Sequence, residues 1–330
     1  RLRRKAELER HDDTSFMSDA NPAQRTYLSR EQYEESYGAD QGDIDKVVAF
    51  AKEHELKVVD ISVARRSVLL SGNAKLFSKA FGTEIGKFEL DGATYRLRSG
   101  SITVPESLVD AVEGVFGIDN RPAAKPHYIR APQQNAADTR APPGSFTPVD
   151  LAKLYKFPTN VDGTGQCIGI IELGGGFRTE DIDAYFNMLS LPSPEVVAVS
   201  VDGASNNPSN PNSADGEVML DIEVAAGVAP GAKIAVYFAP NSDSGFLNAI
   251  TTAIHDKVNR PSVISISWGN PELLWSPQSM RSFNAAFQTA AALGVSICCA
   301  AGDNGSGDQN PEFDQPVDGK PHVDFTGSSP

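Results

Sequence analysis

The chain has 330 residues, enough for about two domains that each bury a core of their own. Its 29 basic and 43 acidic residues give a formal net charge of −14, and no apolar run approaches the ~18 residues of a membrane span. Three cysteines are too few for a disulfide framework and show no zinc-binding spacing with the five histidines, so the sequence predicts no metal site within these residues.

The charge is unevenly divided along the chain. Residues 1–140 hold 21 basic and 22 acidic side chains, whereas residues 141–330 hold 8 basic and 21 acidic ones. This break predicts a domain boundary near residue 140 and argues against nucleic acid as a partner of the acidic half. A domain that works in acid would fit, although an acidic surface can also serve solubility alone.

The first 120 residues predict a small α+β domain. Apolar residues at helical spacing alternate with β-branched runs, and Asp91-Gly92 is a strong hairpin signal. The expected elements, in chain order, are a helix over 44–51 with Asp43 as its N-cap, strands over 57–63 and 67–71, a helix over 74–81, and hairpin strands over 84–90 and 94–98. This order matches a ferredoxin-like pattern whose first strand would begin in the fragment 2–5, with the chain starting partway through it.

Residues 121–140 are rich in proline and polar side chains and show no periodicity. Such a composition predicts an exposed linker that is open to proteolysis, with Arg140-Ala141 as the candidate cleavage junction. On composition alone, a passive tether is an equally good interpretation of this segment.

Residues 141–330 predict a doubly wound α/β domain. Near-continuous apolar runs alternate with helical patterns, which is typical of parallel strands covered by helices on both faces. The expected strands are 166–173, 234–238, 262–267 and 295–300, and the expected helices are 179–189, 245–256 and 279–293. Ligands of such a sheet bind outside the carboxyl ends of its strands.

Several residues are expected at that rim of the sheet. Glu172 ends the first strand, Ser267-Trp268-Gly269 ends the third, and Gly302-Asp303 follows the last. A tryptophan is usually core or an interface anchor, but Ser-Trp-Gly at a strand end can also offer its backbone and an amphipathic ring to a bound peptide.

Two carboxylates, Glu217 and Asp221, lie four residues apart in an otherwise apolar segment. On a helix their side chains project roughly 40° apart around the axis, so they share one face. Like charges held close cannot both ionise freely, and such a pair is costly unless a site uses it. The sequence leaves two interpretations open, a catalytic pair or an ordinary acidic pair that faces solvent.

Four segments, in order, resemble the sedolisin (serine-carboxyl) peptidases, and among these the kumamolisin-type precursors; they are residues 216–224, 229–240, 264–269 and 300–306. The resemblance covers essentially the whole chain. It implies an activation propeptide over 1–120, its linker over 121–140, and the first part of a subtilisin-like catalytic domain over 141–330. It also implies a secreted endopeptidase active at acidic pH, with polypeptide substrates and its own propeptide as partners and neither nucleic acid nor membrane.

Carried over residue by residue, the resemblance implies that Glu217 is the general base, Asp221 the acid that orients it, and Asp303 the oxyanion-hole donor. Glu172 and Trp268 match positions in the hydrogen-bond network around the pair. Asp303 can donate to an oxyanion only while protonated, which an acidic medium favours. Glu217 must be ionised to accept a serine proton, and a carboxylate cluster splits its pKa values so that both conditions can be met.

The family's nucleophilic serine belongs to a Gly-Thr-Ser motif, which does not occur in the 330 residues. The resemblance implies that this serine and a Ca²⁺ site both lie beyond Pro330, so we expect the gene to continue and this chain alone to be inactive. Two alternatives remain. One is a non-enzymatic, propeptide-type inhibitor or binding protein, and the other is a nucleotide-binding domain that would use the weak phosphate-loop signal Gly174-Gly175-Gly176.

The charge division also suggests a hypothesis for activation. Acid would protonate carboxylates that pair with basic propeptide residues such as Arg121, Lys125 and Arg130, and the loosened propeptide would expose its linker to cleavage.

Overall fold

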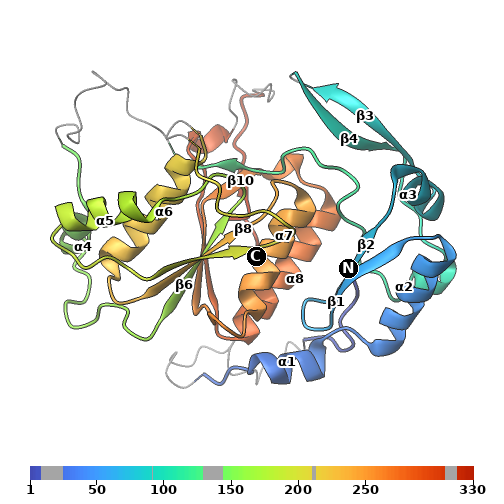
Figure 1. Cartoon of the computed structure of the whole chain (residues 1–330), viewed down its shortest axis with the longest axis horizontal. Helices are drawn as coiled ribbons and strands as arrows, with labels where there is room; N and C mark the ends of the chain where they lie inside the picture. Colours follow the sequence, from blue (N-terminus) through green and yellow to red (C-terminus); the bar gives the residue numbers. More distant parts are fainter. Residues whose placement is uncertain (9–24, 91, 129–143, 210–212, 309–317) are drawn as a thin grey trace.

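The structure, a computed structural model, describes residues 1–8, 25–90, 92–128, 144–209, 213–308 and 318–330 (Figure 1). A larger part contains a parallel sheet between helices, and a smaller part, formed by the first 120 residues, packs against one side of it. Among the described residues no helix is long and apolar enough to cross a membrane.

The larger part is built on a five-stranded parallel sheet in the order β11-β9-β6-β8-β7. The strands are β6 (Cys167–Glu172), β7 (Val196–Ser200), β8 (Lys233–Phe238), β9 (Val263–Ile266) and β11 (Ser296–Cys299). The four predicted strands are confirmed to within two residues at each end. The strand β7 was not predicted, because its short run Val-Val-Ala-Val lies between polar turns and gives little periodic signal.

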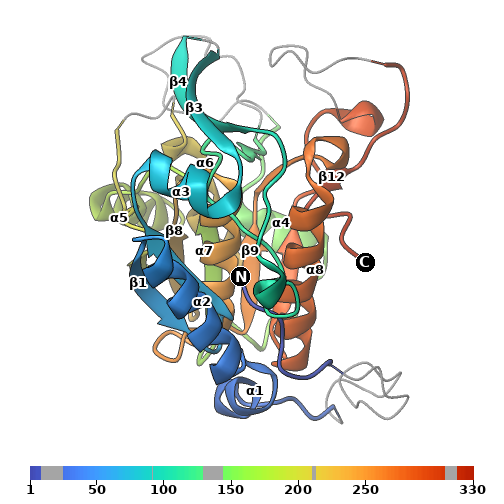
Figure 2. The same cartoon turned by 90° about the vertical axis from the view of Figure 1, so that its right-hand side faces the viewer.

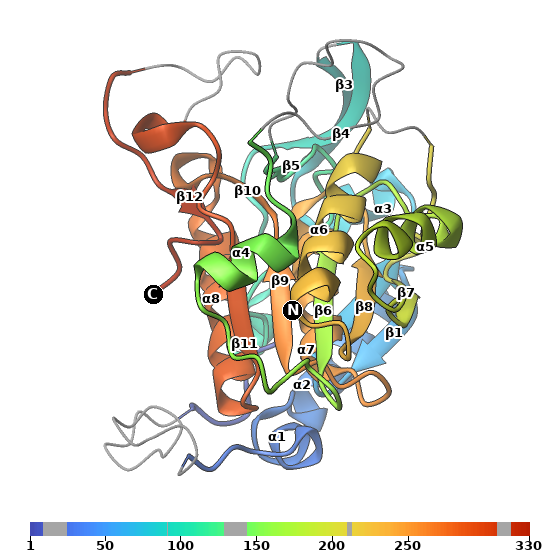
Figure 3. The same ribbon diagram turned by 90° about the vertical axis from the view of Figure 1, so that its left-hand side faces the viewer.

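Helices cover both faces of this sheet, as the sequence predicted. They are α5 (Thr179–Met188) and α6 (Asp215–Val228) on one face, with α4 (Pro148–Leu154) against α6, and α7 (Asp243–His255) and α8 (Pro277–Ala292) on the other (Figures 1 and 3). The strand β8 has five buried residues out of six, because helices lie on both its sides. The doubly wound α/β class is therefore confirmed.

The position of α6 follows from this connectivity. A helix that leads into a parallel strand begins at the rim where the preceding strands end, so the first turn of α6 lies at the carboxyl edge of the sheet. Its apolar side chains Val218, Ile222 and Ala226 are buried in the core beside Phe186 and Phe238. This packing fixes the rotation of the helix about its axis.

The smaller part contains the predicted elements, with one addition. It consists of α1 (Arg30–Tyr37), α2 (Gln41–Glu53), β1 (Lys57–Ser62), β2 (Ser67–Ser71), α3 (Ala74–Phe81), β3 (Glu84–Leu90) and β4 (Ala93–Ser99). The strands form two antiparallel pairs, β1-β2 and β3-β4. Leu2 bridges Val112, and its amide donates to the carbonyl of Arg66 at 2.7 Å, so the first residues do pair with this part of the chain.

Two helix starts differ from the sequence analysis. The N-cap of α2 is Asp40, whose side chain accepts from the amide of Gly42, and not Asp43, which lies in the first turn. The helix α1 was missed because its sequence has no apolar stripe, and Tyr33 is its one buried residue. A capping box between Ser29 and Gln32 starts it, and Tyr33 anchors it to the larger part.

The smaller part docks mainly on the face formed by α7 and α8 (Figure 2). The Tyr33 hydroxyl shares a hydrogen bond of 2.8 Å with Thr289 of α8, and the Arg4 guanidinium donates to Ala285 and Thr289 of the same helix. Arg30 donates to the carbonyls of Ile254 and Pro261. Both arginines thus donate to uncharged acceptors, and an ion pair of 2.7 Å joins Lys257 of the larger part to Glu34 of α1.

The predicted exposed linker is only partly correct. Residues 123–128 are buried or half-buried, and Lys125–Pro126 forms strand β5, which pairs with β10 (Trp268–Pro271) in a small sheet completed by β12 (Asp324–Phe325). Composition could not predict this, because the pairing partner is more than a hundred residues away in sequence. The junction Arg140-Ala141 and the rest of the linker lie outside the described residues.

Candidate active site

The two carboxylates of α6 lie where that helix meets the turn between β9 and β10. The Ser267 hydroxyl donates a hydrogen bond to Oδ1 of Asp221 at 2.8 Å. Glu217 is only 1% exposed, and neither of its carboxyl oxygens has a hydrogen-bond partner among the described residues. The interpretation of an acidic pair facing solvent is therefore wrong for Glu217, and α6 instead exposes Leu220 and Val224.

Glu172, at the end of β6, is the third carboxyl group of the site, beside Glu217 and Asp221. It is fully buried, and its Oε2 accepts a hydrogen bond from the indole N–H of Trp268 at 2.9 Å. Trp268 is itself buried. Its ring packs in the core, and its one polar atom, the indole nitrogen, donates to the carboxyl group. The sequence analysis placed both residues at this rim, and the structure brings them together.

The three carboxyl groups form one electrostatic cluster. Burial, with the charges of Asp221 and Glu217, raises the pKa of Glu172 well above its usual value. Burial and the charges of Asp221 and Asp303 raise the pKa of Glu217 to about 8, and burial raises the pKa of Asp221 to about 6. Because like charges in a poorly solvated site cannot all ionise, the cluster holds protons near neutral pH.

Asp303 approaches the cluster from the loop that follows β11. It is exposed, and its charge contributes to the raised pKa of Glu217, which identifies it as a neighbour of the pair. Glu217, Asp221, Glu172 and Asp303 thus come from two elements, α6 and β6, and from the loop after β11, which meet at the carboxyl edge of the sheet.

The backbone of Ser267, Trp268 and Gly269 is occupied by the segment that contains β5. Gly269 and Trp268 pair antiparallel with Lys125 and Pro126, and the carbonyl of Ser267 accepts from the amide of His127 at 2.8 Å. The sequence analysis expected this strand to offer its backbone to a peptide. In the structure the peptide that it holds is part of the chain itself.

A second polar group lies behind that strand and was missed from the sequence. His127 Nε2 lies 3.1 Å from Oδ2 of Asp324, and both side chains are buried. A Cβ atom on residue 269 would collide with both, so a glycine is required there. Burial and Asp324 raise the pKa of nearby Asp308 to about 6. No local motif flags these residues, because only long-range pairing brings them together.

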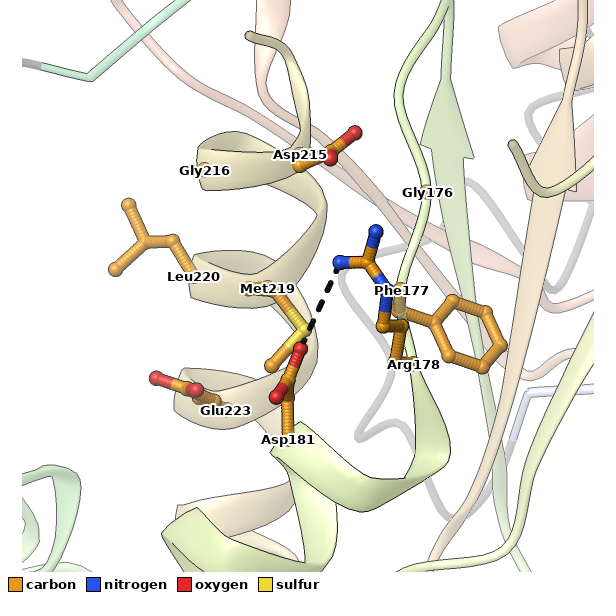
Figure 4. Close-up of a pocket in the computed structure, with 9 residues that line it drawn as sticks. All are labelled: Gly176, Phe177, Arg178, Asp181, Asp215, Gly216, Met219, Leu220 and Glu223. Atoms are coloured by element: carbon orange, nitrogen blue, oxygen red, sulfur yellow. Dashed lines mark ion pairs between the residues drawn. The ribbon is translucent and has the colours of Figure 1, made fainter. Parts of the chain in front are cut away.

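A separate cavity of about 290 Å³ lies between α6 and the loop that joins β6 to α5 (Figure 4). Arg178 and Asp181 line it with an ion pair of 3.9 Å, and Met219 and Glu223 line it from α6. These α6 residues lie on a different face of the helix from Glu217 and Asp221.

The glycine run 174–176 does not form an open phosphate loop. A Cβ atom on Gly176 would collide with residues 206–208, and the amide of Phe177 donates to the side chain of Asn206 at 2.8 Å. The run is thus packed against protein, and the nucleotide-binding alternative loses the feature on which it rested. The described residues contain no cluster of three or more side chains suited to a metal ion.

Comparison with known proteins accounts for both parts of the chain. Residues 2–121 match the family described as Pro-kumamolisin, activation domain, and residues 197–318 match the Subtilase family. Over its whole length the chain is 47% identical to kumamolisin of Bacillus sp. (strain MN-32), of which it spans 59%. The chain belongs to the sedolisin family of peptidases.

Two further matches have lower identity. The chain is 28% identical to tripeptidyl-peptidase sed5 of Aspergillus fumigatus over 93% of this chain and 56% of that protein. A solved structure of Pseudomonas sedolisin, a serine-carboxyl proteinase complexed with two molecules of pseudo-iodotyrostatin, matches 56% of this chain and 51% of its own with 23% identity and a TM-score of 0.48. The chain thus spans between half and three fifths of the length of these relatives.

Proposed function

We propose that this chain is the propeptide and the first part of the catalytic domain of a secreted, acid-active serine-carboxyl endopeptidase zymogen. In it, residues 1–120 act as an intramolecular inhibitor and residues 121–140 as the linker that is cut near Arg140-Ala141. The observation that carries the proposal is strand β5, which lies on β10 directly beside the buried carboxylate cluster. A linker segment that binds as an added strand after the propeptide holds the place a substrate would take.

The carboxylate pair has the features of an acid–base site. The two carboxyl groups of α6 titrate as a coupled pair, and in the docked state burial raises the pKa of Glu217 to about 8 and that of Asp221 to about 6. Glu217 therefore holds its proton while the linker strand covers the site, and its action as a base requires that the strand leave and solvent reach the pair. We assign Glu217 as the general base and Asp221 as the residue that orients it. Both oxygens of Glu217 are buried and have no donor among the described residues, and a serine hydroxyl would provide one.

Asp303 is assigned as the oxyanion donor. A neutral carboxylic acid can donate a hydrogen bond to an oxyanion, whereas a carboxylate would repel it, so this role needs an acidic medium. The side chains of Glu172 and Trp268 support the pair through their hydrogen bond, while the backbone of Trp268 lies on the strand that would hold the substrate.

The nucleophile and the metal site are assigned to sequence outside these residues. No Gly-Thr-Ser motif occurs in the 330 residues, and the described part of the chain offers no cluster of metal ligands, so a family-like Ca²⁺ site has no fit there. On this proposal the chain by itself hydrolyses nothing, and the endopeptidase activity belongs to a longer protein.

Activation by acid has a physical basis at the interface of the two parts. Arg121 forms its ion pair with Asp119 at 2.6 Å and also lies in the field of Asp243 of the acidic half, and Arg130 lies outside the described residues. The expected pairing of Arg121 and Lys125 with the acidic half stays a prediction. A better candidate is His255 of α7, whose ring lies 5.3 Å from that of Tyr33. Burial and the charges of four arginines of the smaller part, Arg1, Arg30, Arg66 and Arg65, lower its pKa to about 3.

The docked propeptide keeps His255 neutral. Acid favours the protonated form of His255, and protonation therefore opposes docking. Once released, His255 would titrate near 6.5, so protons favour the released state at every pH below that value. We propose that this difference contributes to activation at low pH.

The test is peptide hydrolysis by the protein that the complete gene encodes, at pH 4 and at pH 7, compared with its Glu217→Gln variant. We expect self-processing and hydrolysis at pH 4 only, and neither from Glu217→Gln. A fully active Glu217→Gln protein would refute the assignment. Absence of hydrolysis by the complete protein, together with inhibition of another acid peptidase, would support the alternative of a propeptide-type inhibitor.

A further inference from the structure

Ser267 lies between β9 and β10 and contacts both halves of the candidate site. Its hydroxyl donates to Oδ1 of Asp221 at 2.8 Å, and its carbonyl accepts from the amide of His127 at 2.8 Å. The first contact reaches the carboxylate pair and the second reaches the peptide on β10. The proposed mechanism gives the carbonyl a role in holding peptide but leaves the hydroxyl unused.

The hydroxyl fixes one of the two oxygens of Asp221. Oδ1 takes the hydrogen bond from Ser267, whereas Oδ2 is buried and has no partner among the described residues. Rotation of the carboxyl group would break the bond to Oδ1 and leave two buried oxygens without donors, which is costly. The side chain of Asp221 is thereby held in one orientation, with Oδ2 left without a partner among the described residues.

The hydroxyl also favours the charged form of the pair. Burial raises the pKa of Asp221, and the hydrogen bond from Ser267 acts against that rise. A donor that serves a carboxylate stabilises its ionised state. Without it, the pair would keep its protons to a higher pH.

We propose that Ser267 is a positioning residue, whose hydroxyl holds Asp221 in the orientation that the carboxylate pair needs. This inference rests on the proposed function, because it assigns a further residue to the same site. The carbonyl of Ser267 accepts from the bound peptide and its hydroxyl donates to Asp221. One residue therefore sets the position of a substrate strand relative to the carboxylate pair.

The test uses the complete protein and its Ser267→Ala and Ser267→Thr variants, with kcat and KM measured from pH 3 to pH 7. A hydrogen bond to a charged group corresponds to about one pKa unit, so in Ser267→Ala we expect the acid limb of kcat to move up by about one pH unit, with kcat about tenfold lower on that limb. KM should change less than about twofold, because the carbonyl of residue 267 is kept. Ser267→Thr retains a hydroxyl and should restore the profile.

A purely structural role would predict a different pattern. If Ser267→Ala lowered kcat equally at every pH, or if Ser267→Thr behaved like Ser267→Ala, the inference would be overturned. Failure of this inference is distinguishable from failure of the proposed function, because only the latter leaves Glu217→Gln active.

A second readout needs no activity. In the 330-residue chain, Ser267→Ala should reduce the midpoint of chemical denaturation more at pH 8 than at pH 5, because the lost hydrogen bond served an anion. Equal losses at both pH values would contradict the inference. If the alanine variant does not fold, Ser267→Cys, with a weaker donor, is measured in its place and should show the same pH trend.

Discussion

Trp268 donates its indole N–H to Oε2 of Glu172 at 2.9 Å, and the two side chains are 3% and 0% exposed. The bond links the end of the central strand β6 to the start of β10, the strand that holds the linker peptide. Within the described part of the chain, the one hydrogen-bond donor to this carboxyl group is therefore a residue of the strand that holds the linker peptide, so the stability of the site and its geometry depend on the same contact.

Replacing Trp268 by phenylalanine should destabilise the chain through that bond. The substitution keeps an aromatic ring but leaves a buried carboxyl group without a donor, at a cost of about 1–3 kcal/mol beyond the change in packing. The matched control is Trp275→Phe, since the Trp275 indole donates to the carbonyl of Asn270 at 3.2 Å and not to a titratable group. Urea denaturation should show a larger loss for Trp268→Phe, and equal losses would contradict the role given to Glu172.

The carboxylate cluster should make the chain less stable as pH rises. Glu217 has a pKa of about 8 in the folded chain and about 4.3 when unfolded, so the folded state binds more protons between these values and the free energy of unfolding falls with pH across that window. Glu217→Gln should flatten the slope and be more stable than the parent chain at pH 8, by a few kcal/mol at most. The control is Glu195→Gln, at an exposed residue paired with Lys233.

Denaturation midpoints at pH 5, 6, 7 and 8 measure this slope. Because His255 makes stability rise with pH up to about 6.5, the carboxylates are tested between pH 7 and pH 8. A parent chain whose stability rose across that interval would show that the cluster is ionised in the folded state, contrary to the burial of Glu217 and Glu172.

The local pattern of the sequence was enough to predict most of the two folds. Helix α3 and strand β2 match their predicted bounds, because their apolar periodicity and the left-handed Gly82 after α3 are local signals. Glu217 and Asp221 could be recognised because a shared helix face depends only on spacing. Their burial could not, since it depends on which face of α6 packs against the sheet and on the turn at Ser267.

Long-range pairing explains what the sequence did not reveal. The strand β5 has two residues and no periodicity, and only its partner Trp268–Pro271 makes it a strand. The sequence places His127 in a polar linker, and only the pairing of β5 with β10 brings it to Asp324. The buried Tyr33 in the charged helix α1 likewise depends on a surface that forms only when α7 and α8 have folded.

Acid should loosen the smaller part from α7 and α8 through His255. Its pKa is about 3 while docked and near 6.5 when released, so docking is fully favoured above pH 6.5 and weakens as pH falls toward 3, by about 100-fold between pH 7 and pH 4.5. His255→Phe keeps a ring against Tyr33 but cannot titrate, and should stay docked at pH 4.5. Hydrogen-exchange protection of α1 at the two pH values, corrected for intrinsic rates, measures this, with His322→Gln as the control.

The pairing of His127 with Asp324 predicts a side-chain preference in the proposed enzyme. When the linker leaves, a substrate residue that takes the place of His127 meets a buried carboxyl group, so a cationic or imidazole side chain should be favoured there over leucine. Asp324→Asn should lower kcat/KM for arginine-containing peptides by about 10- to 100-fold and change that for leucine-containing peptides little. The matched control is Asp318→Asn, whose carboxylate pairs with His322 on a more exposed loop. Loss of activity on both kinds of peptide alike would assign Asp324 to the support of Gly269 and not to specificity.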